Sequence, residues 1–134
     1  MKIIKIIKSN LCLAILLNIG TASAYSPEEL EKMCKKPRFT DFNLSEYKAP
    51  SNIETPPEAE FIVKISAWAD PTTIKLTAKK EPLAFTIQST STFHKISAKL
   101  PASLNGEYVR IDVGAKAVLG CDDKAGWLIK VAKP

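Results

Sequence analysis

The chain has 134 residues, of which 46% are hydrophobic and 25% are charged, a composition typical of a single globular domain. Its 19 basic and 14 acidic residues give a formal net charge of +5 at pH 7. A nucleic-acid-binding protein normally shows a dominant basic field, because phosphate neutralisation supplies most of its affinity. A small excess of this kind argues against a nucleic-acid partner.

The first 24 residues are predicted to be a helical secretory signal peptide that is cleaved. Three lysines form a basic start, Leu11 to Ile19 form an apolar centre, and Ala22-Ser23-Ala24 is the small-residue pattern that precedes a cleavage site. The apolar run is about half the roughly 20 residues that a membrane span needs, so no span is expected after cleavage. We therefore expect a periplasmic or secreted protein whose mature chain begins at Tyr25.

Cleavage changes both the charge and the cysteine count. Removal of three lysines leaves 16 basic and 14 acidic residues, a net charge of +2. Cys12 leaves with the signal peptide, and Cys34 and Cys121 remain. An even number of cysteines in an exported chain usually means a disulfide, and the pair lacks the Cys-x-x-Cys spacing of redox proteins. We predict a structural Cys34–Cys121 bridge.

The start of the mature chain carries the signals of a short helix over residues 25–36. Ser26 can cap it, Pro27 suits the first helical position, and Glu29 completes a capping box. Pro37 should end the helix, because a proline disfavours helical geometry in the residue before it.

From Phe39 onward the hydrophobic pattern alternates, with turn signals about every ten residues, as in a sandwich or barrel. Residues 43–57 are rich in proline, serine and asparagine and are predicted to be a loop. We expect residues 83–87 to form a hairpin with residues 74–78, and a bulge within residues 93–99. The predicted strands cover residues 39–42, 61–66, 74–78, 83–87, 93–99, 108–118 and 127–132.

About seven strands in residues 37–134 is the size of an immunoglobulin-like antiparallel β-sandwich, so the fold class is all-β. The pattern also resembles bacterial immunoglobulin-like modules of surface and periplasmic proteins. The resemblance covers nearly all of the chain after Phe39 and implies a fold more than a function. It departs from antibody domains, because the second strand has no cysteine for an intersheet bridge. The residues that carry it are Phe39 to Phe42, Pro56, Phe61-Ile62-Val63, Asp70-Pro71-Thr72-Thr73-Ile74, Leu104-Asn105-Gly106-Glu107-Tyr108, Ala117 to Cys121 and Trp127.

The sequence favours a protein that is not an enzyme. Its one histidine, His94, lies in a predicted strand, and no Gly-x-Ser-x-Gly motif accompanies it. Acid-base or nucleophilic catalysis needs a base beside a nucleophile and a third group that orients the base. We therefore predict no catalytic residues, and a hydrolase that uses His94 remains the weakest of three hypotheses.

Neither a metal nor a cofactor is expected. Copper would need clustered histidine, methionine or free cysteine, which the mature chain lacks. Calcium could use Asp70, Asp112, Asp122 and Asp123, but these residues do not form an Asp-x-Asp-x-Asp loop.

Recognition surfaces are the remaining route to a function. Trp68 and Tyr47 do not occupy inward-facing positions of the predicted strands, so they are the candidate binding residues. They could instead cover the ends of the sandwich. Lysines at outward strand positions could attract anionic envelope polymers or protect sheet edges. We expect a monomeric or weakly associating binding or structural module whose partner is an unknown protein or an envelope polysaccharide. The alternative is a small exported inhibitor or immunity-type protein that acts on an envelope enzyme.

Overall fold

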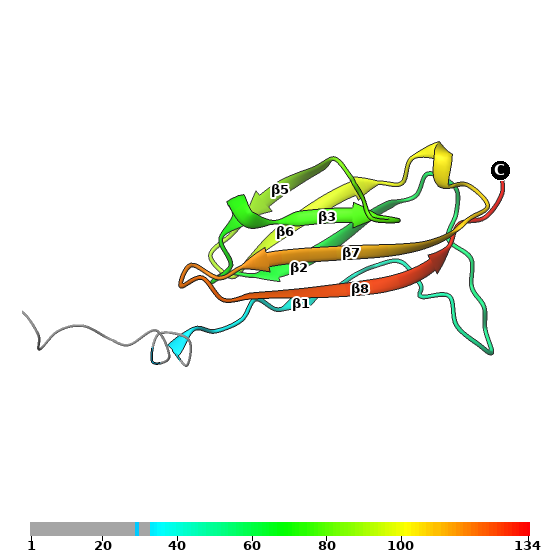
Figure 1. Ribbon diagram of the computed structural model, residues 1–134. Coiled ribbons are helices and arrows are strands. Elements are labelled where there is room, and N and C mark those ends of the chain that lie inside the picture. Colours follow the sequence, from blue (N-terminus) through cyan, green and yellow to red (C-terminus); the bar gives the residue numbers. More distant parts are fainter. Residues whose placement is uncertain (1–28, 30–32) are drawn as a thin grey trace, which may run out of the picture. The chain divides into compact units, whose positions relative to one another are not determined.

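The alternating strands form two antiparallel sheets that pack face to face (Figure 1). The computed structural model describes Glu29 and residues 33–134, and one unit spans residues Cys34–Pro134. The predicted signal peptide lies outside the described residues. Of the helix predicted over residues 25–36, Glu29 and Met33 are helical, whereas Cys34 to Lys36 have no helical structure.

Each sheet contains four strands. The first has the order β1-β2-β6-β5, and the second has the order β4-β3-β7-β8. Within Cys34–Pro134 the helical elements are two 3-10 turns, η1 (Pro71–Thr73) and η2 (Ala102–Leu104). The strands are β1 (Phe39–Thr40), β2 (Glu60–Ser66), β3 (Lys75–Ala78), β4 (Glu81–Pro82), β5 (Phe85–Ser89), β6 (Phe93–Lys99), β7 (Tyr108–Lys116) and β8 (Asp122–Lys130).

The core lies between the sheets because every second residue of the central strands points inward. In β2 the buried side chains are Phe61, Val63 and Ile65, as the sequence predicts. They belong to the same cluster as the inward residues of β7, which are Val109, Ile111, Val113 and Ala115. Burial of this apolar surface is the main source of stability for such a sandwich.

One predicted strand pairing is wrong. β4 pairs with β3 over two residues, whereas β5 pairs with β6 in the other sheet. The chain crosses between the sheets at Leu83 and Ala84. Pro82 has no N–H and is confined to the edge of its sheet, so the β3–β4 hairpin stays short.

The predicted bulge in β6 is also wrong. β6 pairs without interruption with β2 on one side and with β5 on the other. His94 shares the inward phase of Ile96 and Ala98, and Phe93 faces outward. The sequence did not reveal this regular alternation because His94, a polar residue, occupies an inward position where an apolar residue is expected.

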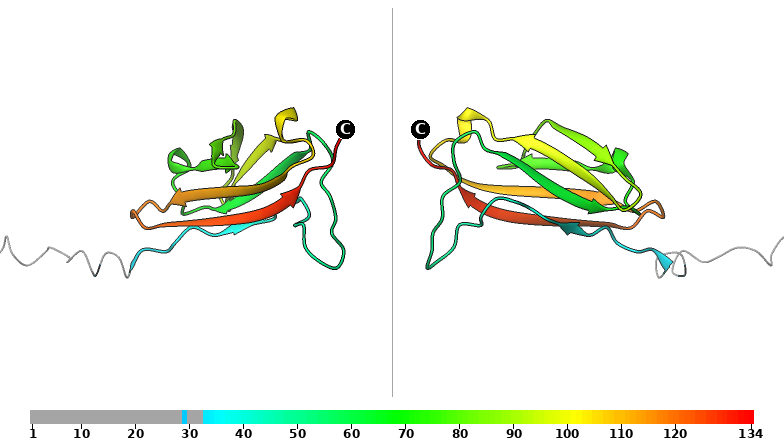
Figure 2. Two further views of the ribbon diagram at one scale, coloured as in Figure 1. Left: turned by 45° about the vertical axis from the view of Figure 1, so that its right-hand side comes forward. Right: turned by 180° about the vertical axis from the view of Figure 1, so that it is seen from behind.

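The long connection between β1 and β2 is a loop, as predicted. This segment projects from the sandwich at the same end as the C-terminus (Figure 2). Thr55 returns the chain to the sheet through a parallel bridge with Val131. Phe42, at the start of this connection, stacks on Trp127 of β8 with ring centroids 4.2 Å apart, which covers one side of the core.

Candidate functional site

The predicted disulfide is present. Cys34 and Cys121 are bonded with their Cα atoms 6.0 Å apart. The N–H of Cys121 also donates to the Cys34 sulfur at 3.2 Å. The bridge fastens the segment before β1 to the turn between β7 and β8.

Trp68 lies at this same end of the sandwich and is half-buried. Its Nε1–H donates to the backbone oxygen of Lys36 at 2.9 Å, and its own backbone oxygen accepts from the N–H of Val118 at 3.1 Å. The Nζ of Lys35 lies 3.7 Å from the centroid of its ring, a cation–π contact. The residues that flank the disulfide therefore hold Trp68 in place.

A hollow of about 300 Å³ lies between Trp68 and the outer face of the first sheet. The Nζ of Lys64 lies 4.6 Å above the ring of Phe93 and 3.3 Å from Oδ2 of Asp41. The hollow is lined by Arg38, Thr40, Asp41, Lys64, Ile65, Ser66, Trp68, Thr92 and Phe93. We call this set, together with Lys35, the Trp68 hollow.

The charges of the Trp68 hollow are predominantly positive. Arg38, Lys35 and Lys64 supply three cations, and Asp41 supplies one carboxylate. Arg38 is exposed and makes no ion pair with any residue that the structure describes. Cations gathered around a hollow attract an anionic group, because their fields add.

Tyr47, the second predicted binding residue, does not join Trp68. Its backbone N–H donates to the oxygen of Leu128, near the far end of β8, at 2.9 Å. Its ring packs edge to face on Tyr108 with centroids 5.4 Å apart, and a hydrogen bond with Tyr108 raises the pKa of Tyr47 above its ordinary value of 10.0. Tyr47 therefore belongs to the cover over the β8 edge.

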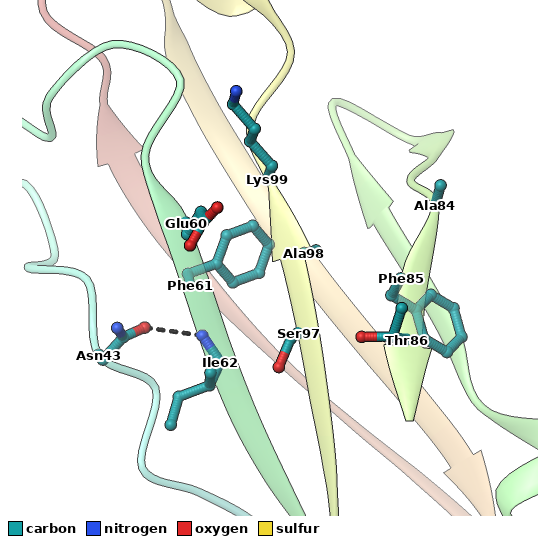
Figure 3. Close-up of a pocket in the computed structure, with 10 residues that line it drawn as sticks. All are labelled: Asn43, Glu60, Phe61, Ile62, Ala84, Phe85, Thr86, Ser97, Ala98 and Lys99. Atoms are coloured by element: carbon teal, nitrogen blue, oxygen red, sulfur yellow. Dashed lines mark hydrogen bonds between the residues drawn. The ribbon is translucent and has the colours of Figure 1, made fainter. Parts of the chain in front are cut away.

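A second, larger hollow of about 640 Å³ opens toward the other end of the first sheet (Figure 3). Oδ1 of Asn43 accepts from the N–H of Ile62 at 2.8 Å. The side chain of Asn43 thus bonds to β2 beyond the end of β1. The hollow is lined by Asn43, Glu60, Phe61, Ile62, Ala84, Phe85, Thr86, Ser97, Ala98 and Lys99. No sequence motif marks these residues, because the register of β2, β6 and β5 brings them together.

His94 has a serine beside it. The His94 Nδ1 lies 2.7 Å from Oγ of Ser89, and its Nε2 lies 3.3 Å from the oxygen of Ala67. His94 is 8% exposed as a whole residue, and neither it nor Ser89 lines either hollow. These contacts tie the end of β5 to the segment after β2 and satisfy a polar group in the core.

Two of the four candidate calcium ligands, Asp70 and Asp112, have other partners. Asp70 caps η1, accepting from the N–H and the hydroxyl of Thr72 at 2.9 and 2.7 Å. These bonds lower the pKa of its carboxyl. Asp112 pairs with Arg110 at 3.1 Å. Among the residues described, no group of three or more histidine, cysteine, aspartate or glutamate side chains could hold a metal.

A membrane-crossing helix is likewise not found in the described part of the chain. The fold is thus a two-sheet antiparallel β-sandwich with a disulfide at one end. Comparisons with protein-family models, curated proteins and solved structures found no significant match.

Proposed function

We propose that this chain is an exported, non-enzymatic binding module of immunoglobulin-like fold, and that it binds an anionic envelope polysaccharide through the Trp68 hollow. The observation that carries the proposal is the arrangement of Lys35, Arg38 and Lys64 around the rings of Trp68 and Phe93.

The strand order supports the immunoglobulin-like assignment. When β1 to β8 are lettered A, B, C, C′, D, E, F and G, the sheets have the orders A-B-E-D and C′-C-F-G. Immunoglobulin domains place A, B, E and D in one sheet and C, F and G in the other. The disulfide differs, since it lies at one end of the sandwich and does not join the centres of the sheets.

Export is supported by the signal-peptide pattern and by the disulfide, because disulfides persist in oxidising compartments. The bridge has a further consequence for the site. Lys35 and Lys36 directly follow Cys34, so the bridge holds both residues beside Trp68.

An anionic polymer fits the first sheet better than a neutral one. Lys95 pairs directly with Lys64 across the strands, and Lys99 lies further along the same outward face of β6, where it pairs with Glu60, the one acidic residue of β2 and β6. The lysines continue from the Trp68 hollow along β6 toward the second hollow. A flexible chain with regularly spaced carboxylates could contact several of them at once.

Binding to polysaccharides of different charge tests the proposal. We expect polygalacturonate to bind the purified protein and neutral dextran of similar length not to bind. Arg38→Ala and Lys64→Ala should each weaken binding about two- to fivefold, because each removes one solvent-accessible charge at the hollow. Lys75→Ala, on the other sheet, is the matched control and should bind as the unaltered protein does.

Two results would count against this ligand class. One is equal binding of the charged and neutral polymers. The other is equal loss of affinity in Lys75→Ala, which would mean that only net charge matters. Failure of all polymers, with saturable binding to an envelope hydrolase, would favour the inhibitor hypothesis.

A further inference from the structure

The two sheets have four edge strands, and three of them are protected against pairing with another chain. β1 and β4 are two residues long, and β4 contains Pro82. β8 is covered near its end, where the N–H groups of Tyr47 and Thr55 donate to the oxygens of Leu128 and Lys130, and the rest of it carries three charged residues. Short strands, proline, charge and covering loops are the usual protections of sheet edges.

β5 carries none of these protections. Residues 83–93 contain no charged residue and no proline, and β5 itself is five residues long. It lies at the margin of the sandwich, with β6 as its one partner (Figure 1). Ile87 pairs with the buried Ile96 and therefore lies on the core side of its sheet, yet it is 41% exposed.

The hydrogen-bond phase of β5 shows which of its groups are free. The N–H of Thr90 donates to the oxygen of Phe93, which marks these two residues as a hydrogen-bonded pair. In an antiparallel ladder such pairs alternate, so Gln88 and Thr86 also bond to β6. Phe85, Ile87 and Ser89 therefore direct their backbone N–H and C=O groups away from β6, toward the open edge.

Phe85, Ile87 and Ser89 can pair with the same three residues of a second molecule. When a second β5 runs antiparallel beside the first with a two-fold axis at Ile87, Ile87 pairs with its own copy and Phe85 pairs with Ser89. All six residues then exchange main-chain hydrogen bonds, and no like charges face each other. We propose that β5 is a homodimerisation edge that joins the first sheets of two molecules into one eight-stranded sheet.

The interface is small, so the dimer is a weak one. A single five-residue pairing falls below the area of stable protein complexes, and we expect a dissociation constant of about 0.01 to 1 mM. This inference does not depend on the proposed ligand, because the Trp68 hollow and β5 share no residue.

Sedimentation velocity from about 10 μM to 1 mM protein tests the proposal. The unaltered protein should shift from monomer to dimer over this range. Ile87→Lys should raise the dissociation constant at least tenfold, because two ammonium groups would meet at the axis. Ile87→Pro should do the same and leave the sandwich folded, because it removes only an N–H that points outward. Leu128→Lys, on the β8 edge, should dimerise normally.

Cross-linking tests the register. The Cα atoms of a hydrogen-bonded antiparallel pair lie about 5.5 Å apart, within the range of a disulfide. Ile87→Cys should give a disulfide-linked dimer, and Thr86→Cys should give much less, because in this register Thr86 faces Gln88 of the second copy. The proposal is wrong if the unaltered protein stays monomeric at 1 mM, or if Leu128→Lys abolishes the dimer and Ile87→Lys does not.

Discussion

Thr55 is 2% exposed, yet its hydroxyl has no hydrogen-bond partner among the described residues. A buried hydroxyl without a partner costs about 1 to 3 kcal/mol. Thr55→Val keeps the shape and removes the hydroxyl, so we expect the free energy of unfolding to rise by about 1 kcal/mol in urea titrations.

Thr73 is the matched control. Its Oγ1 accepts from the N–H of Lys116 at 2.9 Å and donates to the oxygen of Asp70 at 2.6 Å. Thr73→Val should therefore lower the free energy of unfolding by about 1 kcal/mol. Destabilisation by Thr55→Val would instead reveal a partner for its hydroxyl, such as a buried water.

Asp70 should make stability depend on pH. The hydroxyl and N–H of Thr72 hold the pKa of Asp70 below its ordinary value of 3.8. A carboxyl with a lowered folded-state pKa contributes stability above its unfolded-state pKa, and this contribution is lost as the pH falls through the folded-state value. The stability difference between the unaltered protein and Asp70→Asn should shrink between about pH 6 and pH 2. A difference that is constant over this range would contradict the role of the carboxylate.

At the scale of elements, the disulfide joins parts of the chain that lie 87 residues apart. On the chain-entropy model, closing so long a loop stabilises the fold by about 4 to 5 kcal/mol. Cys34→Ser with Cys121→Ser should lower the unfolding free energy by about 2 to 5 kcal/mol. A change below about 1 kcal/mol would mean that the segment before β1 contributes little to the fold.

The same double variant should alter the environment of Trp68, because Lys35 and Lys36 would no longer be fastened beside it. We expect the fluorescence of the folded variant to shift and its affinity for polygalacturonate to fall. An unchanged affinity would show that the hollow forms without the bridge.

The sequence predicts some elements well for a physical reason. In β2 and β7 one face is buried and the other is exposed, so alternation appears directly in the residue types. The pairing of β5 was not predicted. The chain crosses from one sheet to the other at Leu83 and Ala84, so β5 pairs with β6, and the local sequence pattern does not indicate this crossing. The alternation of β6 was missed because His94 is polar yet points inward, where hydrogen bonds to Ser89 and Ala67 satisfy its ring.

At the scale of the whole molecule, the sequence predicts less of the site than of the fold. The sequence identifies Trp68 as an aromatic residue that does not occupy an inward-facing strand position. Its neighbours Arg38, Lys64 and Phe93 come from separate segments and meet only through strand pairing. Tyr47 shows the same pattern in the sequence but packs over the β8 edge, so the position of an aromatic residue in a loop does not predict its surroundings in the fold.

The chain has two tryptophans, which makes one measurement decisive for the proposed ligand. The two indole N–H signals of Trp68 and Trp127 can be followed by NMR while polygalacturonate is added. Trp68 borders the hollow, whereas Trp127 stacks on Phe42 and does not line it. We predict that the Trp68 signal shifts to saturation and that the Trp127 signal stays in place. A shift of Trp127 alone, or no shift of either signal, would contradict the account.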